Sequence, residues 1–526
     1  MNISDLKTLL DRAEQVRRPW ESIFTECYDY ALPNRTEFRR ATNPAASREG
    51  QRNTDYIYDQ TAVVGVMEFA SRLQYNMMPP FATWARLVPG SQVPDEDVEE
   101  VQEQLDQINR IVFEELSQTT FDQEIHEAFM DLGVSQGHIL IEPVDSPNEL
   151  MNIRAVPLSN CFVINGADGK PKTIFYVEVL SVGQILDQYS EDIQDKTVLD
   201  ELKRSNKDKQ IKFVDCFNRE RGTIRNPVWK RCRFICQPDS KVGDDQIYKG
   251  EGSSPWIVFR WSKATGESYG RGPLINALPS VRTVNALMEF TLEAAEWAVG
   301  GMYQADDDGT INPDTIVLEP RAIIPRARGS SIEPIQSGSD FNVGLELISH
   351  MQDAIKKALY NERLGPREGT PPTATEIQER MLELARDIGA SFGRLQAELA
   401  RPVIMRVLYL LDQKGLIEIP KVNGKVIDIE IQSPLARAQR IEDVQNLARF
   451  GELVQGIYGP QAALVALDQT EGVSYLAERL MLPMALVRDK EQAAQMLQTM
   501  MEQIQQTTSG PVAGPSNEGV PLNQLG

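Results

Sequence analysis

The sequence is poor in the residues and motifs that carry out catalysis. It has three histidines, His126, His138 and His350, and none of them lies in an H-E-x-x-H arrangement. It contains neither a G-x-S-x-G nucleophile turn nor a G-x-x-x-x-G-K-S/T phosphate loop. The glycine-rich stretch GESYGRG at 266–272 has the wrong spacing for a dinucleotide turn, and we expect a hinge there. The sequence therefore predicts no catalytic residue, no cofactor and no metal site.

Cysteine is scarce and scattered. The five cysteines are Cys27, Cys161, Cys216, Cys232 and Cys236, an odd number without paired spacing, which is typical of a reducing compartment. Cys232 and Cys236 lie four residues apart in an alternating stretch, WKRCRFICQ, so a strand would place both on one face. No histidine or second cysteine pair stands nearby, and we expect buried apolar side chains there, not metal ligands.

Basic charge and long apolar runs are also lacking. There are 54 Lys and Arg residues against 76 Asp and Glu, a formal net charge of −22. A protein that coats nucleic acid needs a basic surface, whereas a protein that encloses DNA and repels it does not. No apolar run approaches the length of a membrane span, and the first residues lack the basic and apolar regions of a signal peptide.

The patterns that are present predict an α+β protein that is mainly helical. Apolar spacing is helical over most of the first thirty residues, and five arginines follow in a loop-like arm: Arg35, Arg39, Arg40, Arg48 and Arg52. The arm is either solvated or grips an acidic neighbouring subunit or a phosphate backbone. Helical segments follow from residue 55, and between 139 and 261 the period changes to two, which indicates strands with a turn at NGADGK.

The second half of the chain predicts two amphipathic helices on either side of a proline-rich excursion. The first helix covers 273–299 with Pro279 inside it, and the second runs from Phe341 to Asn361. A loop rich in Gly and Pro follows, and Thr373 with Glu376 fits a capping box that starts a third helix. That helix is expected to reach about Lys414 with a kink at Pro402. Three more helices are expected over 435–505, after a hairpin that turns at Asn423-Gly424.

At this point the chain resembles the podovirus-type head-to-tail connectors, the portal proteins of T7-like phages. The best local matches are IYDQTAVVGVMEFASRLQYNMMPPFATWARL at 57–87, TATEIQERM at 373–381 and IQSPLARAQR at 431–440. The resemblance covers nearly the whole chain. It implies the following division: N-terminal helix and basic arm 1–54, α+β wing 55–272, stem helix 273–299, β clip 300–340, second stem helix 341–363, tunnel loop 364–372, long kinked wing helix and hairpin 373–434, helical crown 435–506, and a disordered tail 507–526.

The resemblance also implies roles for particular residues. The tunnel loop would project into a pore and touch DNA through Arg363, Leu364, Gly365, Pro366, Arg367, Glu368, Gly369, Thr370, Pro371 and Pro372. Lys356 and Lys357 would face the channel from the stem, or lie on an ordinary solvated helix face. The clip would contact the packaging motor and later the tail adaptor through Asp306, Asp307, Asp308, Arg321, Arg326 and Arg328, or these would be solvated turn residues.

The implied function is a ring of identical subunits, expected to be a dodecamer, at one capsid vertex. It would pass double-stranded DNA during packaging and ejection, and it would bind the terminase large subunit and then the tail adaptor. Major capsid, scaffold and internal core proteins are the other implied partners, with assembly in the host cytoplasm and no membrane. The alternatives are another virion assembly protein, such as a scaffold or tail tube subunit, and a DNA-processing enzyme. A scaffold would be nearly all helix, and a nuclease or packaging ATPase would need a carboxylate cluster or a phosphate loop.

Overall fold

The structure is a computed structural model of the whole chain. It describes residues 2–35, 38, 41–43, 54–90, 93–94, 98–144, 146, 149–223, 226–300, 303–305, 332–334, 341–361, 389–418, 427–459, 472–473 and 475–476. By internal contacts the chain divides into two units, Met1–Pro434 and Leu435–Gly526. Within the described residues the fold is α+β and mainly helical, as the sequence predicts.

Two antiparallel sheets form the β part of the first unit, and they occupy the segment whose sequence has a period of two. The larger sheet has the strand order β4-β5-β6-β7-β8 and the smaller the order β3-β2-β9. Their bounds are β2 Gln136–Pro143, β3 Met151–Ala155, β4 Cys161–Asn165, β5 Pro171–Ser181, β6 Gln210–Thr223, β7 Asn226–Cys236, β8 Ser240–Lys249 and β9 Trp256–Arg260. The predicted NGADGK turn joins β4 to β5, and Gly169 there has a φ of 70° that favours glycine.

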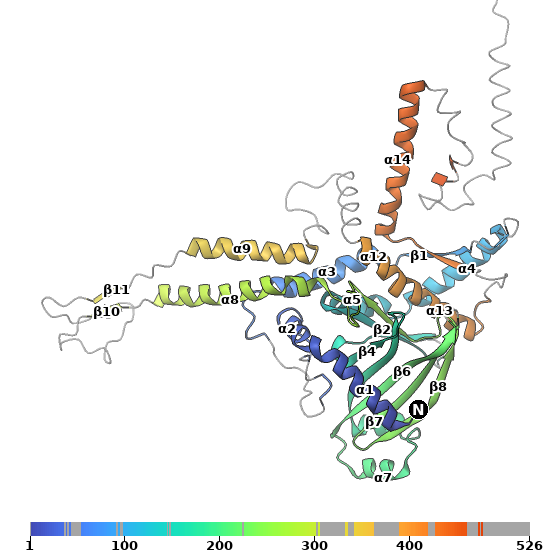
Figure 1. Cartoon of the computed structure of the whole chain (residues 1–526), viewed down its shortest axis with the longest axis horizontal. Coiled ribbons are helices and arrows are strands. Elements are labelled where there is room, and N and C mark those ends of the chain that lie inside the picture. The colour runs from blue at the N-terminus through green and yellow to red at the C-terminus, as the bar shows by residue number, and fades with distance from the viewer. Residues whose placement is uncertain are drawn as a thin grey trace, which may run out of the picture. The chain divides into compact units, whose positions relative to one another are not determined.

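The larger sheet is covered on one face by the first helix of the chain. Helix α1 (Ile3–Arg17) places Leu6, Leu10 and Ala13 against Phe175 and Cys216 of the sheet (Figure 1). Cys232 is buried in the same cluster and Cys236 packs against it, so both cysteines lie on one face as predicted. Burial raises the pKa of the Cys232 thiol to about 12, and such a thiol behaves as a small apolar side chain. Two short helices, α6 (Val182–Tyr189) and α7 (Lys196–Arg204), occupy the polar insertion before β6.

Helices from distant parts of the chain pack together beside the smaller sheet. Their bounds are η1 Arg18–Trp20, α2 Glu21–Ala31, α3 Thr61–Met77, α4 Val98–Ser117, α5 Phe121–Val134, α8 Pro273–Gly300 and α9 Phe341–Ala358. One apolar cluster joins α2, α3, α8 and α9, and it includes Phe24, Val66, Leu278 and Ile355. This cluster fixes the base of α8 and α9 on the body of the first unit.

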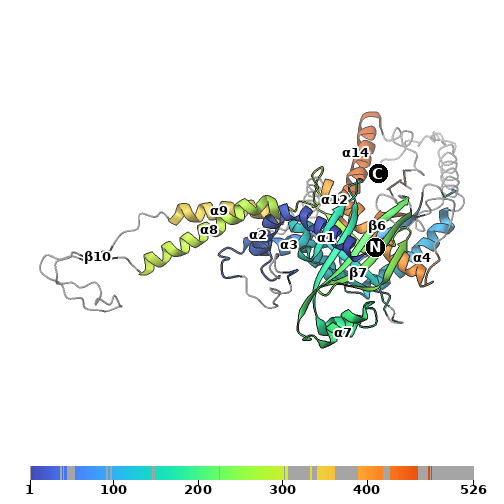
Figure 2. The ribbon, with the colours of Figure 1, turned by 60° about the horizontal axis from the view of Figure 1, so that its bottom comes forward.

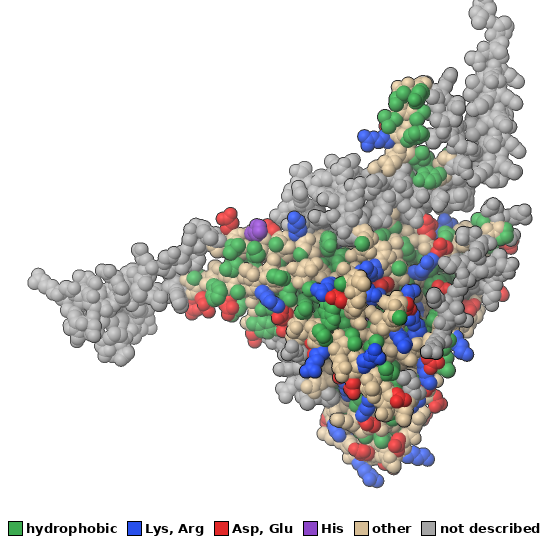
Figure 3. All heavy atoms as spheres, in the orientation of Figure 1, with side chains coloured by type: hydrophobic (Ala, Val, Ile, Leu, Met, Phe, Trp, Pro, Cys, Tyr) green, Lys and Arg blue, Asp and Glu red, His purple; other side chains and the backbone are tan. Residues whose placement is uncertain are grey.

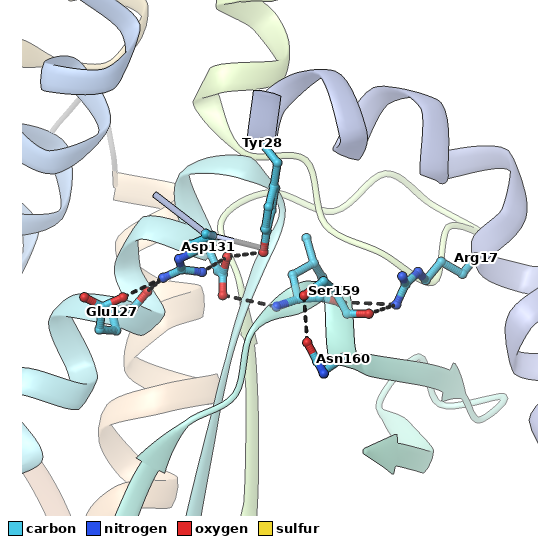
Figure 4. A network of polar contacts seen from close by, with 8 residues as sticks. Arg17, Tyr28, Glu127, Asp131, Ser159 and Asn160 are labelled. Carbon is cyan, nitrogen blue, oxygen red and sulfur yellow. Dashed lines mark hydrogen bonds and ion pairs between the residues drawn. The ribbon is translucent and has the colours of Figure 1, made fainter. Parts of the chain in front are cut away.

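A buried polar network joins α1, α2 and α5 to the sheets (Figure 4). Asp131 on α5 accepts hydrogen bonds from the Tyr28 hydroxyl at 2.6 Å and from the Leu158 backbone N–H at 3.1 Å. It also forms an ion pair with Arg35. Burial alone would lower the pKa of Arg35, but the Asp131 carboxylate raises it above its ordinary value. The prediction of an outward basic arm is therefore wrong at Arg35, because that side chain neutralises a buried carboxylate of its own chain.

Arg17 is the second buried cation of this network. Its guanidinium donates to the carbonyl oxygen of Ser159 at 2.8 Å and lies over the rings of Phe38 and Phe162, at 4.4 and 4.1 Å from their centroids. Burial lowers the pKa of Arg17 from its ordinary value. The planar guanidinium of Arg17 spreads its charge over several atoms, so it can stack on the two rings while it donates hydrogen bonds. The ammonium of a lysine concentrates its charge at one atom and would not replace it there.

The second half of the glycine-rich stretch, residues 269–272 directly before α8, is closely packed, so the predicted hinge is wrong there. A Cβ built on Gly272 would lie 2.1 Å from the Gly133 carbonyl oxygen, and one on Gly270 would lie 2.6 Å from that of Ser135. Tyr269 between them is buried. Gly270 and Gly272 therefore serve the close approach of two backbones.

The long helix expected over 373–414 is described from Gly389, and it is not one regular α-helix. It consists of α12 (Gly389–Leu395), a π-helical turn η3 (Gln396–Ala400) and α13 (Arg401–Gln413). Pro402 stands at the start of α13, where its missing N–H needs no partner within the helix. The expected irregularity at Pro402 therefore takes the form of a preceding π turn.

The strand after this helix has a different partner from the one expected. Strand β12 (Ile427–Ile431) pairs antiparallel with β1 (Ala85–Pro89), and Ile431 lies opposite Ala85. In the described part of the predicted first hairpin strand, residues 416–418 are not in a strand, and the Asn423-Gly424 turn lies outside the described residues. The second unit, described by itself, contains all but the first residue of helix α14 (Pro434–Tyr458), and Gly459 directly after the helix has a φ of 87°. The rest of the expected crown and the tail lie largely outside the described residues.

Candidate channel helices and the residues at their base

Helices α8 and α9 form an antiparallel pair that extends away from the sheets of the first unit (Figures 1 and 2). The predicted helix 273–299 corresponds to α8, which continues through Pro279 without a break. At the far end of the pair, the short strands β10 (Tyr303–Ala305) and β11 (Ile332–Pro334) pair antiparallel. Helices α8 and α9 therefore connect the body of the first unit to the two ends of the proline-rich excursion.

The segment before α3 makes polar contacts with both helices at the base of the α8–α9 pair. Asn285 of α8 accepts a hydrogen bond from the backbone N–H of Tyr58 at 2.8 Å and donates to the carbonyl oxygen of Tyr56 at 3.1 Å. Gln352 of α9 donates to the Asp59 carboxylate at 2.6 Å. The other Asp59 oxygen accepts from the backbone N–H of Thr61 at 3.0 Å, where α3 begins. One short segment thus sets the positions of both helices relative to α3.

The outer half of the pair exposes large apolar side chains. Phe290 and Leu292 on α8 are 62% and 52% exposed, and Leu345 and Leu347 on α9 are 54% and 42% exposed. Acidic side chains stand among them, and Figure 3 shows both kinds on the visible face of the pair. Exposed acidic residues of this region are Glu293, Glu296, Glu346 and Asp353. Exposed apolar surface, where it is contiguous, is a feature of sites that interact with other molecules.

Lys356 and Lys357 lie in the last turn of α9 and are exposed. The ammonium nitrogen of Lys356 is 3.7 Å from the Asp353 carboxylate one turn earlier. Cations are favourable at a helix C-terminus, so both lysines also have an ordinary structural role there. The predicted channel role of these two residues stays a prediction.

Helix α9 ends at Ala358, earlier than the expected end at Asn361 and the expected segment limit at 363. Tyr360 adopts a left-handed conformation with a φ of 60°, which stops the helix. Asn361 then turns back onto α3, where its side-chain amide donates to the carbonyl oxygen of Gly65 at 3.1 Å. Arg72 of α3 donates in turn to the Asn361 carbonyl oxygen.

The remaining predicted site residues lie outside the described residues. These are the tunnel-loop residues Arg363, Leu364, Gly365, Pro366, Arg367, Glu368, Gly369, Thr370, Pro371 and Pro372, and the clip residues Asp306, Asp307, Asp308, Arg321, Arg326 and Arg328. Sequence reasoning missed Asn285 and Gln352, because a polar residue on an amphipathic helix gives no sign of a partner far away in the chain. The N-cap of α3 is Gln60, without a side-chain hydrogen bond, so no capping pattern pointed to these contacts either.

Among the described residues, no group of three or more His, Cys, Asp and Glu side chains could hold a metal ion. In the same part of the chain, none of the helices has the length and apolar character needed to cross a membrane.

Comparison with known proteins gives one family and several portal proteins. The family described as bacteriophage head to tail connecting protein matches residues 4–487. A probable portal protein of Bordetella phage BPP-1 is 21% identical over 465 residues, covering 85% of this chain and 82% of that protein. The portal protein of Escherichia phage T7 is 22% identical over 460 residues, covering 84% and 80%. That of Enterobacteria phage T3 is 23% identical over 463 residues, again covering 84% and 80%.

Among solved structures, a chain from the virion of a native gene transfer agent particle aligns with 85% of this chain and 99% of its own length. The TM-score is 0.40 and the sequence identity is 13%. The family match spans most of the sequence, and the described fold is the α+β, mainly helical one that the resemblance implied. The chain therefore belongs to the family of bacteriophage head-to-tail connecting proteins, the portal proteins of the head–tail vertex of the virion.

Proposed function

We propose that identical copies of this chain close into a ring whose α8–α9 pairs surround a channel for double-stranded DNA. The observation that carries this proposal is the exposed apolar surface on the outer half of the pair. Phe290 and Leu345 are each more than half exposed, although both lie on helices whose bases are well packed. A neighbouring copy would bury this surface, and a head-to-tail contact between identical subunits forms a ring when its rotation closes.

The net charge of the chain favours a DNA channel and not a protein that coats DNA. The net charge of −22 and the exposed acids of the pair, among them Glu293 and Glu346, would repel phosphates. A wall with many phosphate contacts would bind DNA tightly and stall its movement. Lys356 and Lys357 are exposed cations at the base of the pair, and they would give weak, passing contacts to the duplex.

Two segments would act at the ends of this conduit. Residues 364–372 would form the tunnel loop, whose glycines permit movement and whose prolines restrict it. The excursion 300–340 between α8 and α9 would meet the terminase large subunit during packaging and the tail adaptor afterwards. Capsid, scaffold and internal core proteins would contact other faces of the ring.

The alternatives fit the described fold less well. A scaffold of nearly all helix would not contain the β4-β5-β6-β7-β8 and β3-β2-β9 sheets. We assign no catalytic step to the chain, because the sequence lacks the motifs of a nuclease or a packaging ATPase and the family is one of connectors.

The ring proposal is tested by placing a charge on the exposed apolar surface. Phe290→Asp and Leu345→Asp would each bury a carboxylate in the subunit contact, and we expect the ring to fall to smaller species in native mass measurements. Ile247→Asp is the matched control, because Ile247 is 57% exposed but lies on β8. We expect it to form rings normally. Normal rings from both α8–α9 variants would reject this surface as the subunit contact.

A further inference from the structure

A turn directly after α3 presents a phenylalanine ring to solvent. The backbone N–H of Ala82 donates to the carbonyl oxygen of Pro79 at 3.3 Å, so Pro80 and Phe81 occupy the two central positions of the turn. Phe81 is 93% exposed. Its ring therefore takes almost no part in the core of the chain.

The backbone of Phe81 is in a conformation that favours glycine. Its φ is 59°, and a turn with proline at its second position and a positive φ at its third accommodates glycine best at that third position. For a bulky residue this conformation is strained, and such strain gathers at sites of function. Burial within the chain does not offset the strain, because the ring is exposed. The ring is therefore suited to a contact outside the isolated chain.

The exposed face of α3 continues this apolar surface towards the base of the α8–α9 pair. Val64, Met67 and Tyr75 lie on one side of the helix by their spacing, and each is about half exposed or more. The charged side chains on this side, Glu68 and Arg72, pair with each other at 3.3 Å. The face therefore suits an apolar protein surface and not a phosphate backbone. A helix that is apolar on both sides is normally covered on both.

Beside Phe81 the surface is hollow. Phe81 forms part of the wall of a cleft of about 360 Å³, whose other apolar walls include Trp84, Phe113 and Phe121. Trp84 packs edge-on against Phe113 and stacks with Phe121, with centroids 5.3 and 6.2 Å apart. The turn thus offers a projecting ring next to a cleft with packed walls, a relief that fits side chains of another protein.

The position and extent of this surface favour a second copy of the chain as its partner. Helix α3 packs against α8 and α9 near their bases, so its exposed face adjoins the pair that the ring proposal places against a neighbour (Figure 1). Stable subunit contacts bury about 800 Å² on each partner. The four apolar side chains of the pair are only about half exposed and supply less, since even an aromatic side chain offers only about 150–250 Å². A ring contact therefore extends onto the body.

We infer that Phe81 anchors a contact between neighbouring copies, together with the exposed face of α3 that Val64, Met67 and Tyr75 form. This contact lies on the body of the first unit, and it buries the Phe81 ring only in the assembly. A few buried aromatic anchors carry most of the binding energy of such contacts. This inference rests on the proposed ring.

Phe81→Gly separates assembly from folding. Glycine adopts a φ of 59° without strain and little buried surface is lost, so subunits released by dilution should be at least as stable as those of the parent. Rings should nevertheless dissociate at a chain concentration about tenfold higher or more, measured by native mass spectrometry over a dilution series.

Two further variants are the controls. Gln237→Gly relieves the same backbone conformation elsewhere, because Gln237 is exposed, has a φ of 60° and lies between β7 and β8. Phe81→Tyr keeps an aromatic ring at the turn. Rings of both variants should dissociate at the concentration of the parent.

A photo-crosslinker at the same position identifies the partner. p-Benzoylphenylalanine in place of Phe81 keeps an aromatic ring there, and irradiation of purified rings should join two copies of the chain. Mass spectrometry of the joined peptides locates the attachment point. Irradiation of packaged heads should give the same product.

Three results would overturn the inference while the ring proposal stands. The first is a Phe81→Gly ring that dissociates at the parental concentration, or no more readily than the Gln237→Gly ring. The second is a Phe81→Gly subunit less stable than the parent, because the ring would then serve the fold. The third is a crosslinker at position 81 that joins only DNA, a different virion protein or its own chain. A parent chain that forms no ring would overturn the ring proposal, and the inference with it.

Discussion

The carboxylate of Glu398 accepts hydrogen bonds from both the backbone N–H and the guanidinium Nε of Arg260, each at 3.1 Å. Arg260 ends strand β9 and is 4% exposed, and Glu398 lies in the π turn η3. The pair therefore joins the smaller sheet to the helix that follows the segment 362–388. Glu398 therefore reaches Arg260 from within the π turn.

Removing this carboxylate should destabilise the first unit. Glu398→Ala leaves the buried Arg260 guanidinium without its ion-pair partner, and we expect a loss of about 2–3 kcal/mol in the free energy of unfolding. Denaturant unfolding followed by circular dichroism measures it. Glu398→Gln is the control, because its amide oxygen still accepts a hydrogen bond, and it should lose less. Equal stability of the alanine variant and the parent would mean that the contact contributes nothing.

Stability should fall as the pH is lowered, partly through His138. Burial, with a smaller effect of Arg17, lowers the pKa of His138 from 6.5 to about 3. Below pH 6.5 this histidine binds a proton in the unfolded chain, whereas in the folded chain it binds one only near pH 3. The contribution of His138 to stability is therefore fully present above pH 6.5 and is lost as the pH falls from 6.5 to about 3.

Because of this difference in protonation, the free energy of unfolding changes by up to about 1.4 kcal/mol per pH unit. In His138→Gln the slope should be shallower by that amount, measured by unfolding at a series of pH values between 6 and 4. Parallel pH profiles of the two proteins would show that His138 is protonated equally in both states.

The elements that sequence reasoning predicted well have strong local patterns. Helix α8 was expected over 273–299 and ends at Gly300, because its apolar period is long and the break after it is sharp. The strands between β2 and β9 follow the period of two, and the position of Cys232 and Cys236 on one face follows from it, with Cys232 buried and Cys236 half-buried.

The features that were missed depend on contacts between distant residues. Helix α9 ends early because Tyr360 turns toward Trp261, and no neighbour of Tyr360 in the sequence signals this. Strand β12 pairs with β1 from the far end of the unit, although a nearer hairpin partner was expected. Arg35 looked like part of a solvated basic arm, because only the fold brings it to Asp131. The family resemblance, not local pattern, led to the function.

Deleting residues 366–371 should leave ring assembly intact and reduce DNA retention. The deletion removes the proposed tunnel loop but not Asn361, whose contacts with α3 hold the end of α9. Counting full and empty heads by electron microscopy after packaging measures the effect. A normal proportion of full heads would reject the role of the loop.

Replacing Asp306, Asp307 and Asp308 with alanine should leave the fold and the ring unchanged. The triad would lie at the tip of the proposed clip, so we expect weaker binding of the terminase large subunit, of the tail adaptor, or of both. Binding of each purified partner to assembled rings, measured at two salt concentrations, shows whether charge is involved. Unchanged affinity for both partners would show that the clip tip lies elsewhere.

The mass and shape of the assembled protein test the central claim most directly. Native mass measurement together with electron microscopy of the purified full chain should show closed rings of identical copies, each with an axial hole wide enough for a DNA duplex. A chain that stays monomeric at every concentration, or that forms open filaments or solid particles, would contradict the account.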